Sequence, residues 1–158
     1  KELFMKERTF IAIKPDAVQR GLIGKIITRI EEKGYKIIAL KMLEVTPEMA
    51  AKHYEEHIGK PFYPSLVAFI TSAPIVAMVV EGEDAISGMR QIMGKTNPQN
   101  AEVGTIRGDF SPYMSYNCIH GSDSAESSAR ETAIYFKSEE MCTDWKTVFE
   151  IIKENLEK

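Results

Sequence analysis

The hydrophobic residues of the chain follow two spacings, one typical of β-strands and one typical of α-helices. The stretch "TFIAIKP" (9–15) is apolar on both faces and closes at a proline, which predicts a short buried strand ending at Lys14. In "GLIGKIITRIEEKG" (21–34) apolar residues recur at helical spacing, and the pattern stops at Gly34, a common helix breaker. This second stretch predicts an amphipathic helix.

Strand and helix patterns continue to the end of the chain. The stretch "TPEMAAKHYEEH" (46–57) predicts a helix with Thr46 as its N-cap and Pro47 in its first turn. The β-branched stretch "PIVAMVVEG" (74–82) predicts a core strand. The other predicted elements are strands at 35–45 and 116–119 and helices within 61–72, 83–94, 124–136 and 143–158.

Residues 95–114 lack this patterning. They carry glycine, proline and asparagine without a sustained period, which predicts a loop that is long for so small a domain. Long ordered loops of this kind are often functional. Without insertions, the order of elements is β-α-β-β-α-β. We therefore expect an α+β fold of the ferredoxin-like type, with a four-stranded antiparallel sheet, helices on one face and the long loop inserted.

Composition limits the possible classes of protein. The chain has 158 residues, 44% of them hydrophobic, so we expect one domain over residues 1–158. We expect residues 1–6 to be a flexible or non-native start. This start resembles neither a signal peptide nor a membrane anchor. Cys118 and Cys142 form no CxxC pair, which favours a reducing, cytoplasmic setting over a disulfide framework. The net charge of −3 argues against a general nucleic-acid binder, so any anionic ligand must be held by a local cluster of cations.

The stretch "YNCIHGSDS" (116–124) contains the strongest candidate for chemistry. His120 ends a predicted strand, Gly121 adds no side chain beside it, and a hydroxyl or acid among residues 122–124 can cap the next helix. Glu131, on the face that begins at Ser124, can reach back to the imidazole and fix its tautomer, which a histidine nucleophile needs. The plainer alternative is that His120 bonds a turn and Glu131 is solvated.

Cations and aromatic residues elsewhere extend this hypothesis. Lys14 ends the first strand, Arg90 lies late in a helix, and Arg107 lies in the long loop with Thr96. Each alone is typical of a surface residue, but together they can converge on one polyphosphate. Phe62, beside two prolines, can stack on a base or simply be partly buried.

Four blocks in order along the chain carry a resemblance to a known family. They are "ERTFIAIKPDAVQRGLIGKII", "HYEEHIGKPFYPSLVAFITSAPIVAMVVEG", "GKTNPQNAEVGTIRGDF" and "NCIHGSDS". From about Glu7 to Phe136 the chain resembles the nucleoside diphosphate kinases. The combination of "NxxHGSDS" with "TIRGDF" is highly specific to that family.

This resemblance implies ping-pong transfer of the terminal phosphoryl group from a nucleoside triphosphate to a nucleoside diphosphate, with broad base specificity and a phosphohistidine intermediate on His120. By analogy, Phe62 stacks on the base, Lys14 and Asn117 hold the sugar side, and the arginines with Thr96 hold phosphates. The positions that match the family's nucleotide-binding residues are Lys14, Phe62, Arg90, Thr96, Arg107 and Asn117, and those that match its supporting residues are Tyr54, Ser122 and Glu131.

The reaction explains why a histidine should carry the phosphoryl group. It exchanges one phosphoanhydride for another, and phosphohistidine has a comparable transfer potential, whereas a phosphoserine at Ser122 would be an energetic sink. The motif has no acidic metal cage, so we expect Mg²⁺ to arrive on the nucleotide phosphates.

The resemblance also implies a homo-oligomer, with a hexamer favoured and a tetramer possible, although the C-terminal segment from Met141 matches the family less well. We expect no membrane partner and no dedicated nucleic-acid binding.

Other functions compete with this interpretation. In "HYEEH", His53 and His57 stand four apart on a helix, but a zinc-protease helix needs glutamate directly after the first histidine, where Tyr54 stands. We therefore expect two surface histidines. "GLIGKI" lacks the spacing of a phosphate-binding P-loop. A nucleotide-sensing module on the same fold remains possible, in which the pocket binds but no phosphoryl group moves.

Overall fold

The computed structural model describes residues 6–158, which build a four-stranded antiparallel sheet in the order β2-β3-β1-β4. The strands are β1 (Lys6–Ile13), β2 (Lys36–Leu43), β3 (Ile75–Glu83) and β4 (Ile119–Gly121). The chain passes from β1 through helices to β2, and from β3 through helices to β4. The expected ferredoxin-like fold is thereby confirmed.

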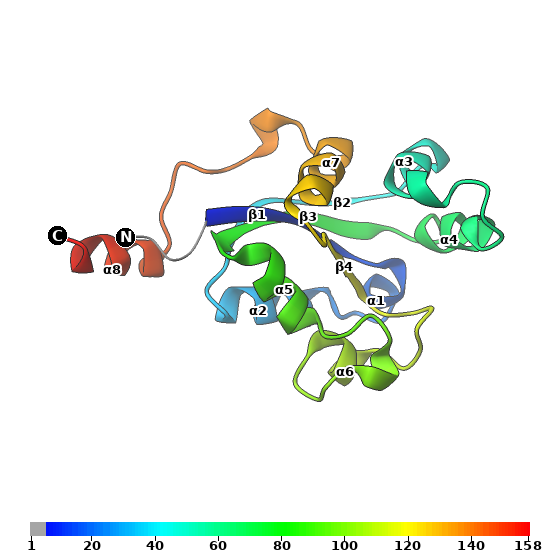
Figure 1. The fold of residues 1–158 in the computed structure, drawn as a ribbon, viewed down its shortest axis with the longest axis horizontal. Coiled ribbons are helices and arrows are strands. Elements are labelled where there is room, and N and C mark those ends of the chain that lie inside the picture. The colour runs from blue at the N-terminus through cyan, green and yellow to red at the C-terminus, as the bar shows by residue number, and fades with distance from the viewer. Residues whose placement is uncertain (1–5) are drawn as a thin grey trace.

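Helices cover both faces of the sheet (Figure 1). The first face carries α3 (Pro47–His53), α4 (Tyr63–Ile70) and α7 (Ala125–Tyr135), and the second carries α1 (Pro15–Gln19), α2 (Ile23–Glu32), α5 (Ala85–Met93) and α6 (Ile106–Phe110). Our expectation of helices on one face was wrong. In β1, Phe10 and Ala12 enter one core while Ile11 and Ile13 enter the other, so both faces are apolar and need cover.

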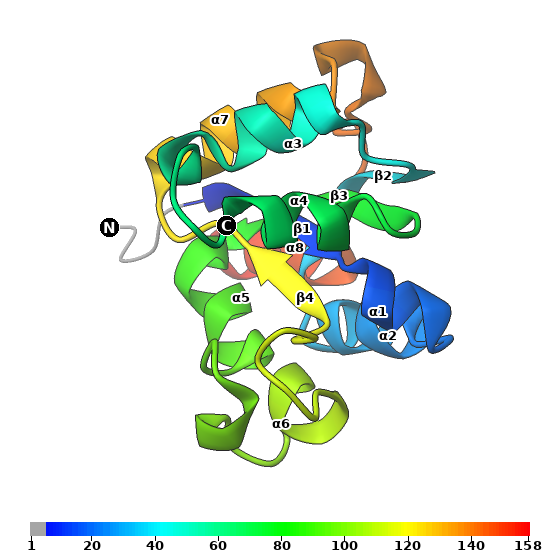
Figure 2. The ribbon, with the colours of Figure 1, turned by 90° about the vertical axis from the view of Figure 1, so that its right-hand side faces the viewer.

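The third helix is shorter than its pattern predicted. Thr46 caps α3 as expected, since its side chain accepts a hydrogen bond from the backbone N–H of Met49 at 3.1 Å. The helix ends at His53, and a 3₁₀ turn over Glu55–His57 replaces its predicted last turn. Figure 2 shows α3 and α7 side by side above the sheet, and both helices contribute buried residues to the core on that face of the sheet. The end of α3 therefore faces α7.

The predicted long loop has structure of its own. It contains a 3₁₀ turn at Pro98–Asn100 and the short helix α6. Thr105 caps α6, because its hydroxyl accepts from the backbone N–H of Gly108 at 3.0 Å. This cap places Arg107 in a buried helical turn rather than in a mobile connection.

The last strand begins later than the sequence suggested. We expected a strand at 116–119, but Cys118 has a backbone φ of 69°, which an extended strand cannot include. The Cys118 N–H donates to Asp16 at 3.2 Å and its carbonyl accepts from the Lys14 N–H at 2.8 Å, and these bonds hold the turn. The strand therefore starts at Ile119 and includes His120.

The C-terminal segment runs along the outer edge of the sheet. The N–H of Cys142 donates to the Ile38 carbonyl of β2 at 2.7 Å, and α8 (Val148–Leu156) follows. Lys6, which we expected in a flexible start, is the first residue of β1 and pairs with Glu150 of α8 at 3.4 Å. The rest of that expectation concerns residues 1–5, outside the described part. Within residues 6–158, no helix has the length and apolar character needed to cross a membrane.

The tight packing under β4 generates a stability prediction. A Cβ added at Gly121 would lie 2.5 Å from the sulfur of Met93 and 3.1 Å from Ile11 Cδ1. We expect Gly121→Ala to lower the free energy of unfolding by about 1–3 kcal/mol, measured by urea denaturation.

Gly24→Ala is the matched control. Gly24 lies in α2, where an added Cβ meets no atom within 4 Å, so this change should be neutral or stabilise by about 0.5–1 kcal/mol. Equal unfolding midpoints for Gly121→Ala and the wild type would contradict the packing described.

Candidate functional site

A polar hollow of about 430 Å³ opens where α3, α5, the long loop, β4 and the start of α7 meet. The predicted site residues that line it are Tyr54, Arg90, Thr96, Arg107, His120 and Glu131. They come from segments far apart in the sequence, and they include two of the three cations of the convergence hypothesis, Arg90 and Arg107. The imidazole of His120 is partly open to this hollow, with 28% of its side chain exposed.

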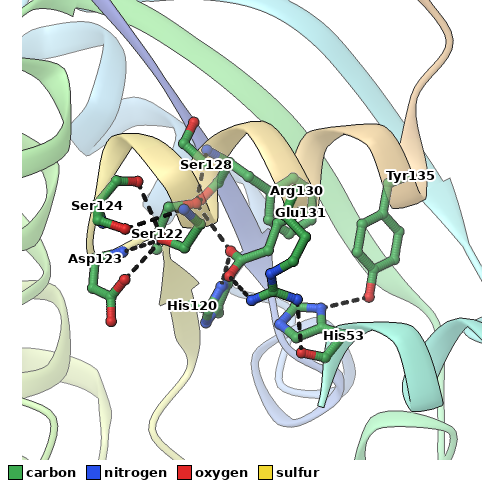
Figure 3. A network of polar contacts seen from close by, with 12 residues as sticks. His53, His120, Ser122, Asp123, Ser124, Ser128, Arg130, Glu131 and Tyr135 are labelled. Atoms are coloured by element: carbon green, nitrogen blue, oxygen red, sulfur yellow. Dashed lines mark hydrogen bonds and ion pairs between the residues drawn. The ribbon is translucent and has the colours of Figure 1, made fainter. Parts of the chain in front are cut away.

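The centre of the site is a hydrogen bond between His120 and Glu131. His120 Nε2 lies 2.6 Å from Glu131 Oε1, and the Ser122 hydroxyl donates to the same oxygen at 2.9 Å (Figure 3). Ser122 is fully buried, and its backbone N–H donates to the Phe10 carbonyl at 3.0 Å. The serine therefore fixes the carboxylate and is itself closed off from the hollow.

The first turns of α7 hold Glu131 in place. Ser124 caps the helix by accepting from the Ser127 N–H at 3.1 Å, and Ser128 donates to the Arg8 carbonyl at 2.6 Å. These bonds tie the helix to β1, with Glu131 buried on the same face. Gly121 lines the hollow beside His120, and it also has a role in packing. Its missing side chain makes room for Met93 of α5, so packing requires this glycine.

Electrostatics settles the tautomer of His120. Burial raises the pKa of Glu131, but the hydrogen bond from His120, the positive charge of each nearby histidine in its protonated form and the Ser122 hydroxyl together lower it below its ordinary value. Glu131 is therefore ionised near neutral pH and accepts the Nε2 proton of His120. The neutral imidazole then has its lone pair on Nδ1.

Arg107 is held by backbone carbonyls beside this pair. Its guanidinium donates to Asn117 O at 3.3 Å, Gly94 O at 2.9 Å and Ile119 O at 2.7 Å. Burial, and then the charge of Arg90, lower the Arg107 pKa to about 10, so it stays charged at neutral pH. Each terminal nitrogen has one further N–H, a pair suited to two oxygens of one phosphate.

Lys14 and Asn117 form a second arm of the site. Lys14 Nζ donates to Asn117 Oδ1 at 2.8 Å, and the Asn117 amide donates to the Thr96 carbonyl at 3.2 Å. Burial and the nearby Arg107 charge lower the Lys14 pKa to about 8. Neither residue lines the hollow, but Arg107, which does, donates to the Asn117 carbonyl at 3.3 Å, so this arm adjoins the hollow.

Arg90 and Phe62 lie at the rim. Arg90 is exposed, and its guanidinium reaches the Gly121 carbonyl at 3.3 Å. Phe62 is outside the lining of the hollow, with 47% of its surface exposed. Its ring lies 5.3 Å from that of His57, which does line the hollow. A flat ring at this edge is accessible for stacking.

Sequence reasoning missed two residues of the site. We expected His53 on a helix surface, but it is 9% exposed and its ring lies 4.8 Å from the His120 ring. Arg130 lies 3.6 Å from Glu131 Oε2 and donates to the Lys52 carbonyl at 3.2 Å, joining α7 to α3. The signal for His53 was its i+3 spacing from the apolar Ala50, which places both on the buried face of α3.

One side-chain set near the nucleophile has metal-ligand chemistry. A ring nitrogen of His53, one of His120 and a carboxylate oxygen of Glu131 lie within 4.8 Å of one another, and these are residue types that bind zinc. Lys14 and Arg130 contribute positive charge at the same place, which disfavours a dication. The geometry suits an anion better than a bound metal.

Comparison with known proteins identifies a family with this arrangement. A family model described as nucleoside diphosphate kinase matches residues 7–141, which leaves α8 outside the match. The nucleoside diphosphate kinase of Moorella thermoacetica is 59% identical over 135 residues, covering 85% of this chain and 97% of that protein. That of Methanocaldococcus jannaschii is 58% identical over 137 residues, covering 87% and 98%.

Solved structures agree with the sequence relatives. A halophilic nucleoside diphosphate kinase from Halobacterium salinarum, in complex with CDP, superposes with a TM-score of 0.89 at 47% identity, covering 94% of this chain and 98% of that one. A nucleoside diphosphate kinase family protein from Babesia bovis gives a TM-score of 0.89 at 45% identity, covering 92% and 98%.

The lowered pKa of Lys14 is directly measurable. With its folded pKa of about 8, the ammonium is charged at neutral pH and loses its proton as the pH rises through that value. In protein labelled with ¹³C at the lysine ε-carbon, we expect one resonance to titrate near that pH and to be absent from Lys14→Met. The control Lys25→Met, which changes an exposed residue of α2, should retain it. If every lysine titrated near its ordinary pKa, the burial and charge pairing assigned to Lys14 would be wrong.

Proposed function

Because this chain belongs to the nucleoside diphosphate kinase family, we propose that the hollow around His120 is where it carries out the family's reaction. The enzyme is a phosphotransferase that moves the terminal phosphoryl group of a nucleoside triphosphate to a nucleoside diphosphate in a ping-pong reaction. The observation that carries our assignment is the 2.6 Å bond from His120 Nε2 to Glu131, which leaves Nδ1 as the nucleophile.

The reaction has two mirror-image halves. In the first, the Nδ1 lone pair attacks the terminal phosphorus, an N–P bond forms, and the P–O bond breaks as the nucleoside diphosphate leaves with the electron pair. In the second, a terminal oxygen of another nucleoside diphosphate attacks, and the N–P bond breaks and returns its pair to Nδ1. Glu131 stabilises the positive charge that develops on the imidazole in both halves.

The burial of Ser122 supports histidine as the carrier. Its hydroxyl donates to Glu131 and the side chain is closed off from the hollow, so it is a poor acceptor for phosphorus. A serine ester would also lie far below an anhydride in energy, whereas a phosphohistidine does not. We therefore assign Ser122 the supporting role of holding the carboxylate.

Cations of the site stabilise the transferred group. The phosphoryl transition state is loose and carries negative charge on its equatorial oxygens, so catalysis consists mainly of positioning and neutralisation. We assign this task to Arg107, through its two remaining N–H groups, and to Arg90 and Thr96. Tyr54 lines the hollow, and burial followed by the Glu131 charge raises its pKa to about 12, so its hydroxyl remains a hydrogen-bond donor.

We assign the binding of the sugar and the base to the second arm of the site and to Phe62 at the rim of the hollow. Lys14 and Asn117, bonded to each other, hold the sugar side. Phe62 stacks on the base, and stacking discriminates little among bases, which supports broad specificity. The Halobacterium salinarum relative was solved with CDP, a pyrimidine nucleotide, and we propose that this chain also accepts pyrimidine nucleotides.

A divalent cation completes the substrate. Members of the family use such ions, and we propose that Mg²⁺ enters on the nucleotide phosphates and keeps most of its water. The cationic lining of the hollow fits a substrate whose charge is only partly neutralised by metal.

We also propose where the protein is located, how many domains it has and how its subunits assemble. The free cysteines Cys118 and Cys142 fit a reducing cytoplasm. We propose that the whole chain forms one domain, since both cores share one sheet. We further propose a homo-oligomer, with a hexamer favoured over a tetramer, which sedimentation velocity distinguishes. The proposal includes no membrane partner and no dedicated nucleic-acid binding.

Glu131→Gln tests the role of the carboxylate. An amide cannot hold a negative charge against the imidazole, so we expect turnover to fall by about 10- to 100-fold with the fold intact. Glu139→Gln, which changes an exposed carboxylate in a 3₁₀ turn, is the control and should keep wild-type turnover. If both variants were equally active, Glu131 would have no part in the reaction.

The covalent intermediate tests the function itself. Incubation with ATP labelled in its terminal phosphate should give an acid-labile labelled protein that passes its label to GDP. His120→Ala should acquire no label but still bind nucleotide by calorimetry, because binding is assigned to other residues. Acid-stable label, or full turnover by His120→Ala, would exclude this mechanism. A wild type that binds nucleotide without labelling would favour the sensing module.

A further inference from the structure

Behind His120 lies a buried pair that the proposed reaction does not use. His53, at the end of α3, and Tyr135, at the end of α7, are 9% and 3% exposed, and His53 Nδ1 lies 2.8 Å from the Tyr135 hydroxyl. Phe10 of β1 stacks on the Tyr135 ring with centroids 4.7 Å apart and planes 11° apart. This stacking fixes the tyrosine, and the tyrosine fixes the histidine.

The pair is directed at the nucleophile. The His53 ring meets the His120 ring edge-on, with centroids 4.8 Å apart and planes at 67°. Figure 3 shows His53 between Tyr135 and His120, with Glu131 next to the two histidines. A ring nitrogen of each histidine and an oxygen of Glu131 fall within 4.8 Å of one another. Because Tyr135 occupies Nδ1, the His53 nitrogen left for this side is Nε2.

Charge and protonation select one tautomer of His53. Burial raises the pKa of Tyr135 above its ordinary value, so the hydroxyl keeps its proton. Burial, and then the positive charges of His120, Lys14 and Arg130, lower the His53 pKa to about 3 despite the opposing charge of Glu131, so the ring is neutral at working pH. With a proton on Nδ1, its Nε2 lone pair would face the Glu131 carboxylate. With a proton on Nε2, an N–H faces that negative charge instead, which is favourable.

We propose that Tyr135 and His53 form a relay that positions the nucleophile. The tyrosine hydroxyl donates a hydrogen bond to His53 Nδ1, and the His53 Nε2–H is thereby directed at the charge of the Glu131 carboxylate beside His120 as a charge–dipole contact. The relay acts through Glu131 and His120 and does not touch the phosphoryl group. It keeps the carboxylate aligned on His120 Nε2, and the edge of the His53 ring fixes the plane of the imidazole so that Nδ1 faces the hollow. The inference rests on the proposed function for the identity of the nucleophile.

The tautomer is open to direct observation. The chain has 3 histidines, so protein labelled with ¹⁵N at the imidazole nitrogens gives few ring spin systems, and His53→Gln identifies the one from His53. We expect the His53 ring to show a protonated Nε2 and a bare Nδ1, unchanged from about pH 5 to pH 9. In Tyr135→Phe, the same ring should become a mixture of tautomers. A protonated Nδ1 in the wild type, or an unchanged ring in Tyr135→Phe, would overturn the relay.

Rapid-quench kinetics gives the functional test. Tyr135→Phe keeps the ring that stacks on Phe10 and removes only the hydroxyl, so we expect phosphorylation of His120 by ATP to slow by about fivefold while nucleotide affinity stays within about twofold. His53→Leu should slow it by about 10- to 100-fold, and His53→Gln, which can present an N–H near the Nε2 position, should fall between wild type and His53→Leu. Tyr113→Phe, at an exposed tyrosine, is the control and should match the wild type.

The outcomes separate this inference from the proposed function. A wild type that forms no acid-labile phosphoenzyme refutes the proposed function, whatever the tautomer of His53. A wild type that forms it normally, with Tyr135→Phe folded by circular dichroism and equally fast, refutes the relay alone. Equal rates for His53→Leu and His53→Gln would likewise contradict the assigned Nε2–H.

Discussion

The bond between His120 Nε2 and Glu131 is the interaction on which the rest of this site depends. An imidazole has two nitrogens, and it is a nucleophile only at the one that carries no proton. The carboxylate stays ionised in a buried position because several donors converge on it, and this stable charge decides which nitrogen is bare. Without that charge, the surrounding cations would hold a phosphate beside a ring of undefined reactivity.

The fold satisfies this requirement by making the site the meeting point of both layers of helices. His120 lies in β4, which α5 and α6 support on one face of the sheet through Met93 and Arg107. Glu131 and His53 come from α7 and α3 on the opposite face. The cations that we assign to the phosphate therefore come mainly from one layer, while the group that sets the tautomer comes from the other. If either layer of helices were displaced, the assigned cations would no longer lie beside an imidazole whose reactive nitrogen is fixed.

The sequence predicts most of the secondary structure and several residues that line the candidate site, since apolar spacing, the cap at Thr46 and the helix-face pattern that carries Glu131 are local features. What it does not predict depends on neighbours distant in the chain. The left-handed turn at Cys118 is held by bonds to Asp16 and Lys14. The stretch 9–15 is visibly apolar on both faces, but the helices that cover each face become evident only from the two cores in which alternate β1 residues are placed. The i+3 spacing from Ala50 places His53 on the buried face of α3, but its partner Tyr135 comes from α7, and no pattern within α3 reveals that contact.

The most direct test of the account is the position of the phosphorus on the imidazole ring. Long-range ³¹P–¹⁵N NMR correlations on the phosphoenzyme, prepared with ¹⁵N-labelled histidine and kept at alkaline pH, distinguish the two nitrogens of His120. If Glu131 holds Nε2 as described, the phosphoryl group is bonded to Nδ1. A phosphoryl group on Nε2 would mean that the bond to Glu131 is broken during the reaction, and the central claim would be wrong.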